Sequence, residues 1–111
     1  MPTKEDLFDQ AVDHVADGAP EAAVTAYRDA LALDPTFADA WQGLALVLAD
    51  LQRYDEAIAA GQKFCELEPE DGLSHTTLSR IYMQAGKVPE AEAEGGKARL
   101  LDWKRQLKEG Q

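Results

Sequence analysis

The sequence has 111 residues, of which 45% are apolar and 29% are charged, and its net charge is −10. This length suits one domain with its own core, and the apolar fraction is too high for a disordered chain. The charge is uneven, since residues 1–86 hold five Lys/Arg against sixteen Asp/Glu while residues 87–111 hold six against five. An acidic body repels phosphate, so we expect no nucleic-acid partner.

The first residues are charged and lack an apolar signal segment, and no stretch approaches the ~20 apolar residues of a membrane span. We therefore expect a soluble, cytoplasmic protein without a membrane partner.

Apolar residues recur at spacings of three and four along the whole chain, which is helical periodicity. Breaks at Gly18 with Pro20, at Gln52, and at Gly86 with Pro89 alternate with breaks at Pro35 and Pro69. The pattern predicts helices near 4–17, 20–33, 38–51, 54–67, 72–85 and 89–108. These pair into three helical hairpins.

The chain also matches itself when it is shifted by 34 residues. Ala23 falls on Ala57 and Ala91, Leu33 falls on Leu67 and Leu101, and Pro35 falls on Pro69. Small residues at such places let paired helices approach closely, so their predicted role is packing.

With this period, the chain resembles a tetratricopeptide-repeat (TPR) protein. The middle copy carries the family pattern most completely, in Trp41, Leu44, Ala45, Leu48, Tyr54, Ala57 and Pro69. The resemblance implies an all-α domain spanning 1–111, a right-handed superhelical stack of three antiparallel helix-turn-helix hairpins. The repeats would cover about 4–37, 38–71 and 72–105.

The outer copies depart from the family pattern. Leu7 and His14 stand where aromatic residues are usual in the first copy, and His75 takes the place of the tryptophan in the third. Trp103 stands where the third terminal proline belongs, so the last helix is predicted to run on to about 108 as a solenoid cap.

Two adjacent glycines, Gly95 and Gly96, interrupt this last helix. Gly95 aligns with Gly61 and with Tyr27, where the family usually has a large aromatic residue. The ring of Phe64 is expected to replace that ring in the second copy. In the third copy, either the Trp103 side chain fills the space or the helices pack more closely. Gly96 either allows a close approach or is a tolerated surface glycine.

Residues with the potential for chemistry are few. Cys65 is the only cysteine, so no internal disulfide is possible, and we expect it to be a small core residue. His14 and His75 occupy places that the repeat reserves for core rings. No phosphate loop or nucleophile motif is present. We expect no catalytic residues, no metal ligands and no cofactor, and a catalytic or ligand-binding domain is disfavoured.

Function is therefore expected to lie on the surface. In TPR proteins the second face of each hairpin's first helix lines the concave groove. Here this face, the predicted groove, consists of Glu5, Phe8, Asp9, Val12, Val15, Asp39, Gln42, Gly43, Leu46, Asp50, Leu73, Thr76, Thr77, Arg80 and Met83. The apolar members have no obvious core role and stand among carboxylates.

Two interpretations of function stay open. In the first, the protein is a non-catalytic adaptor or scaffold whose groove holds an apolar, basic peptide or helix of another protein. Binding of a chaperone C-terminal tail is rejected, because the family's Lys, Asn and Arg clamp residues are replaced by Phe8, Val12, Gly43, Leu73 and Thr77. In the second, Leu100, Trp103 and Leu107 pair between copies, and the protein is a self-assembling homo-oligomer.

Overall fold

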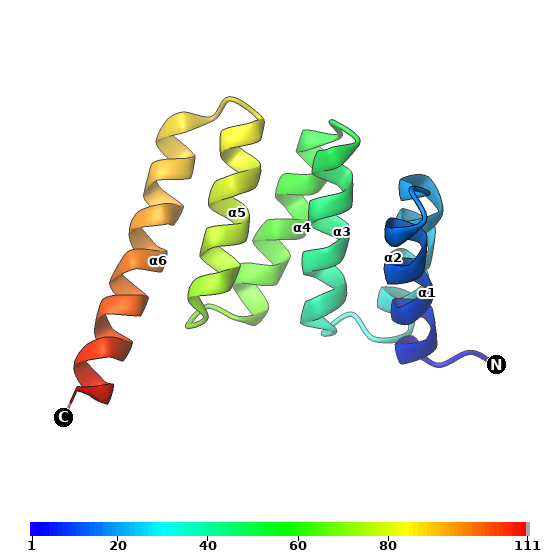
Figure 1. Ribbon diagram of the computed structural model, residues 1–111, viewed down its shortest axis with the longest axis horizontal. Coiled ribbons are helices and arrows are strands. Elements are labelled where there is room, and N and C mark those ends of the chain that lie inside the picture. Colours follow the sequence, from blue (N-terminus) through cyan, green and yellow to red (C-terminus); the bar gives the residue numbers. More distant parts are fainter. Residues whose placement is uncertain (111) are drawn as a thin grey trace.

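A computed structural model describes residues 1–110, which form six α-helices without strands (Figure 1). The helices are α1 (Lys4–Ala16), α2 (Pro20–Leu33), α3 (Ala38–Asp50), α4 (Tyr54–Leu67), α5 (Gly72–Gln84) and α6 (Val88–Glu109). Each agrees with its predicted range within one residue at either end. Consecutive helices pack as the pairs α1/α2, α3/α4 and α5/α6, so the expected three hairpins are confirmed.

The turns inside the hairpins repeat with the sequence period. Gly18 and Gly86 have φ angles of +73° and +79°, in the left-handed region that glycine enters at little cost. Gln52 occupies the equivalent place in the middle hairpin with φ +61°. The left-handed conformation costs a non-glycine residue about 1 kcal/mol, so packing of the adjacent helices has to offset this cost.

Side-chain caps fix two helix starts. The Thr3 hydroxyl accepts a hydrogen bond from the Asp6 backbone N–H, and the Asp6 carboxylate accepts one from the Thr3 N–H. The Asp71 carboxylate likewise accepts the Leu73 N–H at 2.9 Å. These contacts satisfy N–H groups that a helix N-terminus otherwise leaves free.

Small residues lie at the helix contacts, as predicted. Ala11, Ala23, Ala45 and Ala57 are fully buried, and Ala91 is almost so. In the last hairpin, Ser79 replaces the alanine and donates its hydroxyl hydrogen to the Ala91 carbonyl oxygen at 2.7 Å. This polar contact joins α5 to α6 where earlier copies use only apolar packing.

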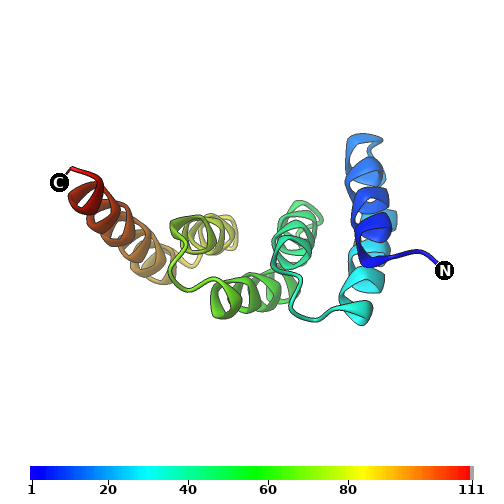
Figure 2. The same cartoon turned by 90° about the horizontal axis from the view of Figure 1, so that it is seen from below.

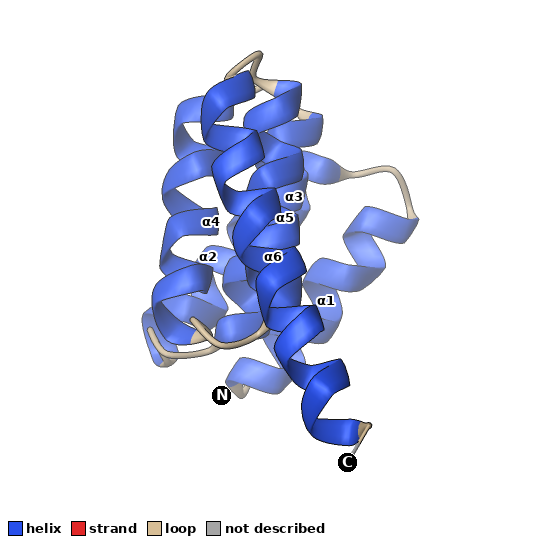
Figure 3. Cartoon of the chain, turned by 90° about the vertical axis from the view of Figure 1, so that its left-hand side faces the viewer, coloured by secondary structure: helices blue, strands red, loops and turns tan. Residues whose placement is uncertain are grey.

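The stack is curved. Figure 2 shows α3 and α5 on one side of the stack and α4 on the other. The helices α1, α3 and α5 form the inner side, since α3 contacts both α1 and α5, whereas α2, α4 and α6 do not contact one another within residues 1–110. Figures 1 and 3 both show the last turns of α6 extending past the helix ends beside it. Within residues 1–110, no helix has the combined length and apolar character needed to cross a membrane.

The two glycines of α6 differ in their surroundings. A Cβ atom added at Gly95 would lie 3.4 Å from the Ser79 hydroxyl oxygen, so Gly95 faces the α5 contact. A Cβ atom at Gly96 would meet only the Arg99 guanidinium, 3.8 Å away. The idea that Trp103 fills the space left at Gly95 is wrong, because the atoms within 4 Å of an added Cβ belong to Ser79 and Arg99. Instead, α5 and α6 approach each other closely at this position.

Candidate interaction surface

The inner helices place most of the predicted groove residues at the surface. Glu5, Asp9, Asp39, Asp50, Thr76 and Arg80 are exposed, and so are the apolar side chains of Val12, Val15, Leu73 and Met83. Leu73 and Met83 each expose about half of their area, at 51% and 53%. Gln42 and Leu46 are half-buried. The hollow side of the stack therefore combines apolar and acidic side chains.

Two members of the predicted groove have core roles that the sequence analysis missed. Thr77 is only 5% exposed, and its hydroxyl oxygen accepts a hydrogen bond from the Gln42 side chain at 3.4 Å. Phe8 packs against the core, with its ring centroid 5.8 Å from that of Tyr27 and 5.1 Å from that of Phe37. The statement that Phe8 has no core role is thus wrong. Its ring packs against Tyr27 of α2 and against Phe37 of the loop between α2 and α3, contacts that the periodicity of α1 alone does not reveal.

A hollow of about 240 Å³ lies where the three inner helices meet. Val15 lines it from α1, Leu46 and Asp50 line it from α3, and Arg80 lines it from α5. Tyr27 also lines this hollow, although it belongs to the outer helix α2.

Gly43 is what lets Tyr27 reach the inner face. A Cβ atom at position 43 would lie only 2.4 Å from Cζ of the Tyr27 ring, well inside van der Waals contact. The ring is 4% exposed, and burial raises the pKa of its phenol. The absence of a side chain at Gly43 thus allows an aromatic ring to pack across the α2/α3 boundary.

Charged side chains on the inner face lack ion-pair partners within residues 1–110. Among residues 1–110, none of the carboxylates of Glu5, Asp9, Asp39 and Asp50 takes part in an ion pair. The exposed cation Arg80 also forms no ion pair in this part of the chain, although it lines the same hollow as Asp50. These charges are available to a binding partner.

The C-terminal part of α6 offers a second exposed surface, which we call the α6 stripe. It consists of Leu100, Trp103 and Leu107, which are 48%, 56% and 51% exposed. The basic residues Lys104, Arg105 and Lys108 lie among them along the helix. About half of each of these side chains is open to solvent, so residues 1–110 leave the α6 stripe largely uncovered.

A larger hollow, about 560 Å³, lies on the outer side and was not predicted. Trp41, Leu44 and Leu48 of α3 line it together with residues of α2 and α4. Arg28 and Glu56, which also line it, form an ion pair of 3.1 Å between α2 and α4. The hollow arises where two outer helices lie over one inner helix, a spacing that no single helix encodes.

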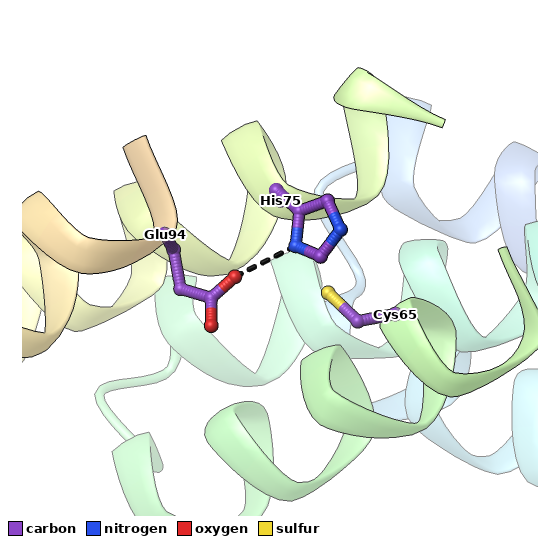
Figure 4. Close-up of side chains that lie close together, drawn as sticks. All are labelled: Cys65, His75 and Glu94. Carbon is purple, nitrogen blue, oxygen red and sulfur yellow. Dashed lines mark hydrogen bonds and ion pairs between the residues drawn. The ribbon is translucent and has the colours of Figure 1, made fainter. Parts of the chain in front are cut away.

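The structure also brings together three residues that the sequence analysis did not connect: Cys65 of α4, His75 of α5 and Glu94 of α6 (Figure 4). His75 Nδ1 lies 2.7 Å from Glu94 Oε2, and Nε2 lies 2.9 Å from the carbonyl oxygen of Pro69. The Lys97 ammonium donates to Glu94 Oε1 at 3.0 Å. His75 is buried, as its place in the repeat predicts, while His14 is half-buried.

Burial shapes the protonation of this cluster. It raises the pKa of the Cys65 thiol, which is half-buried against the core and donates to the Ser74 carbonyl oxygen. Burial also acts to raise the pKa of Glu94, but hydrogen bonds from His75 and Lys97 outweigh it and hold that pKa below its ordinary value. The Glu94 carboxylate is therefore ionised at neutral pH.

Comparison with known proteins agrees with this architecture. A family profile described as tetratricopeptide repeat matches residues 8–72, more than half of the chain. The chain belongs to the tetratricopeptide-repeat family. No curated protein matches it in sequence.

Solved TPR structures resemble nearly the whole chain. A crystal structure of MamA is 25% identical with a TM-score of 0.88, and the match covers 95% of this chain and 61% of that one. The translocator chaperone SycD of Yersinia enterocolitica, described as an alternative dimer, is 21% identical with a TM-score of 0.82, and the match covers 88% of this chain and 74% of that one. The second TPR of Spaghetti (RPAP3), bound to an HSP90 peptide, is 20% identical with a TM-score of 0.82, covering 89% and 92%.

The chain spans about three fifths of the length of the MamA chains that it matches. One further neighbour comes from a structure described as a CopN–Scc3 complex, and it is 19% identical with a TM-score of 0.82.

Proposed function

We propose that this TPR domain is a non-catalytic adaptor that holds an apolar, basic peptide or helix of another protein against its inner face. The observation that carries the proposal is the combination of exposed Val12, Leu73 and Met83 with carboxylates that have no ion-pair partner in residues 1–110. An exposed apolar strip rimmed by one sign of charge favours a complementary partner.

The roles of the two kinds of residue differ. Apolar contacts at Leu46 and in the hollow beside it would hold the complex together, because they lose water on binding. Exposed carboxylates at Asp9, Asp39 and Asp50 would mainly speed association and make it dependent on salt. Arg80 would meet an acidic residue or the chain terminus of the partner.

This partner differs in chemistry from the HSP90 peptide SRMEEVD that one structural neighbour binds. That peptide is acidic at its end, whereas the groove proposed here is acidic itself. The family's clamp positions for such tails hold Phe8, Val12, Gly43, Leu73 and Thr77, none of which offers a cation.

A pair of model peptides tests the proposal. The probes are two amphipathic helical peptides with the same leucine positions, one carrying lysine and the other glutamate on its polar face. We expect the lysine peptide to bind the wild-type protein, with an affinity that falls as salt is added, and the glutamate peptide not to bind. Asp39→Asn and Asp50→Asn should each weaken binding at least threefold at low salt.

The matched control is Asp29→Asn, which removes an exposed carboxylate from the outer helix α2. It changes net charge by the same amount but lies away from the inner face. Equal weakening by Asp29→Asn would mean that net charge alone drives binding, and the groove proposal would fail.

A second function, self-assembly through the α6 stripe, is favoured by the exposure of Trp103 together with Leu100 and Leu107. A copy's basic α6 segment would meet the acidic body of its partner. Sedimentation of the wild-type protein over a range of concentrations tests it, since self-assembly requires a mass that rises with concentration and that Trp103→Ala returns to the monomer.

A further inference from the structure

We propose that Cys65, His75 and Glu94 form a binding site for one Zn²⁺-like divalent cation. One ligand atom from each residue, namely the Cys65 sulfur, a His75 ring nitrogen and a Glu94 carboxylate oxygen, lies within 4.8 Å of the other two (Figure 4). Thiolate, imidazole and carboxylate are the ligand types that Zn²⁺ accepts in proteins. A thiolate and a carboxylate together also balance the two positive charges of the cation.

The orientation of the His75 ring supports the assignment. Its Nε2 lies 2.9 Å from the Pro69 carbonyl oxygen and donates its hydrogen there, which leaves Nδ1 as the nitrogen that faces Glu94. Histidines that bind metal commonly hold their second N–H on a backbone carbonyl or a carboxylate in this way, which fixes the tautomer and the ring direction. The ring of His75 is therefore oriented before a cation arrives.

The geometry requires only small movements. Nδ1 and Glu94 Oε2 are 2.7 Å apart with the proton of a hydrogen bond between them, whereas tetrahedral ligation separates nitrogen and oxygen ligands by about 3.4 Å. A cation would take the place of that proton. The Cys65 thiol would lose its proton and its 3.3 Å contact with the Ser74 carbonyl oxygen and turn toward the other two ligands.

The surroundings supply a supporting contact and access. Lys97 holds Glu94 Oε1 at 3.0 Å, so Oε2 stays directed at His75. His75, Pro69 and Lys97 also line a surface hollow of about 350 Å³, through which a cation and water can enter. Three protein ligands leave a fourth position for water, as in open zinc sites.

Such a site would join three helices of two repeats. Cys65 lies in the last turn of α4, His75 lies in the first turn of α5, and Glu94 lies in the second turn of α6. A cation held by all three would fasten α6 to the rest of the stack, and because binding favours the folded state it would raise thermal stability. This inference does not depend on the proposed peptide groove.

The test uses the reduced, metal-free protein, titrated with Zn²⁺ by calorimetry and with Co²⁺ by absorption spectroscopy. We expect one equivalent of either cation to bind, a sulfur-to-cobalt charge-transfer band, and a Tm that rises with Zn²⁺. Cys65→Ser should abolish the charge-transfer band and weaken Zn²⁺ binding at least tenfold, and Glu94→Gln should weaken it at least tenfold. His14→Gln removes the other histidine and should change nothing.

Several results would overturn the proposal: no saturable uptake by the wild-type protein, a Cys65→Ser variant that binds as tightly as wild type, or a stoichiometry of one cation per two chains. Circular dichroism shows whether each variant is folded. Should Glu94→Gln fail to fold, Cys65→Ser decides alone, since it exchanges one atom at a half-buried position.

Discussion

The indole Nε1 of Trp41 donates a hydrogen bond of 2.8 Å to the carbonyl oxygen of Pro35. One repeat later, the imidazole Nε2 of His75 makes the same contact with the carbonyl oxygen of Pro69, at 2.9 Å. In both repeats a ring on the inner helix ties down the loop that enters it. The histidine in the third copy therefore keeps the hydrogen bond of the tryptophan that it replaces, and its other nitrogen is left to meet Glu94.

Trp41→Ala should destabilise the protein strongly. The substitution removes both the Pro35 hydrogen bond and a ring that packs against the core beside Leu44. We expect a loss of about 3 kcal/mol in the free energy of unfolding, the lower end of the range for such truncations because the ring is half-exposed. Chemical denaturation measures this loss. An unfolding free energy within about 0.5 kcal/mol of wild type would contradict the repeat register.

Trp103→Ala also removes an indole ring, but from an exposed position. The free energy of unfolding of the monomer should therefore stay within about 0.5 kcal/mol of wild type. Measurement at a concentration where sedimentation shows a monomer isolates this effect. A large loss there would mean that Trp103 covers its own hairpin after all.

Two glycine substitutions should have opposite signs. Gly43→Ala forces its new methyl group into the Tyr27 ring, 2.4 Å away, and should cost about 1–3 kcal/mol through overpacking. Gly96→Ala meets only the flexible end of Arg99 and should stabilise α6 by up to about 1 kcal/mol, the difference in helix propensity. Thermal melts of the two variants check the prediction, and two changes of the same sign would refute this account of the glycines.

Acid should weaken the contact between α1 and the α2/α3 loop. Hydrogen bonds from Lys4 and from Thr36 lower the pKa of Asp34 from 3.8 to about 2. Because the folded state favours the ionised carboxylate, the contribution is complete above the unfolded pKa of 3.8 and disappears as the pH falls toward 2. The stability difference between wild type and Asp34→Asn should be constant above pH 5 and shrink below about pH 4. A difference independent of pH would exclude this linkage.

The sequence predicts the helices well because they depend on local information. The 34-residue period fixes where Gly18, Gln52 and Gly86 turn the chain, and helical spacing fixes which alanines are buried. The sequence does not predict contacts between side chains of different helices, because these depend on how far a side chain reaches across the boundary between two helices.

In the candidate site, too, the sequence predicts which helix face a residue lies on but not which residues of other helices it contacts. Periodicity places Asp39 and Met83 on the inner face of the stack. It does not show that Tyr27 crosses to Gly43, nor that Cys65, His75 and Glu94 converge, because these contacts join different helices. The sequence leaves the exposure of Trp103 open as well, because helical spacing along α6 does not show whether another helix covers the ring.

The most direct test of the account is to map where a partner binds. Chemical-shift perturbation of ¹⁵N-labelled protein by the lysine-bearing amphipathic peptide should identify the bound face. The account predicts that the largest shifts fall on α1, α3 and α5, around Val12, Leu46, Asp50 and Met83. Shifts confined to residues 100–107 of α6, or to the outer hollow beside Arg28 and Lys63, would contradict the assignment of function to the inner face.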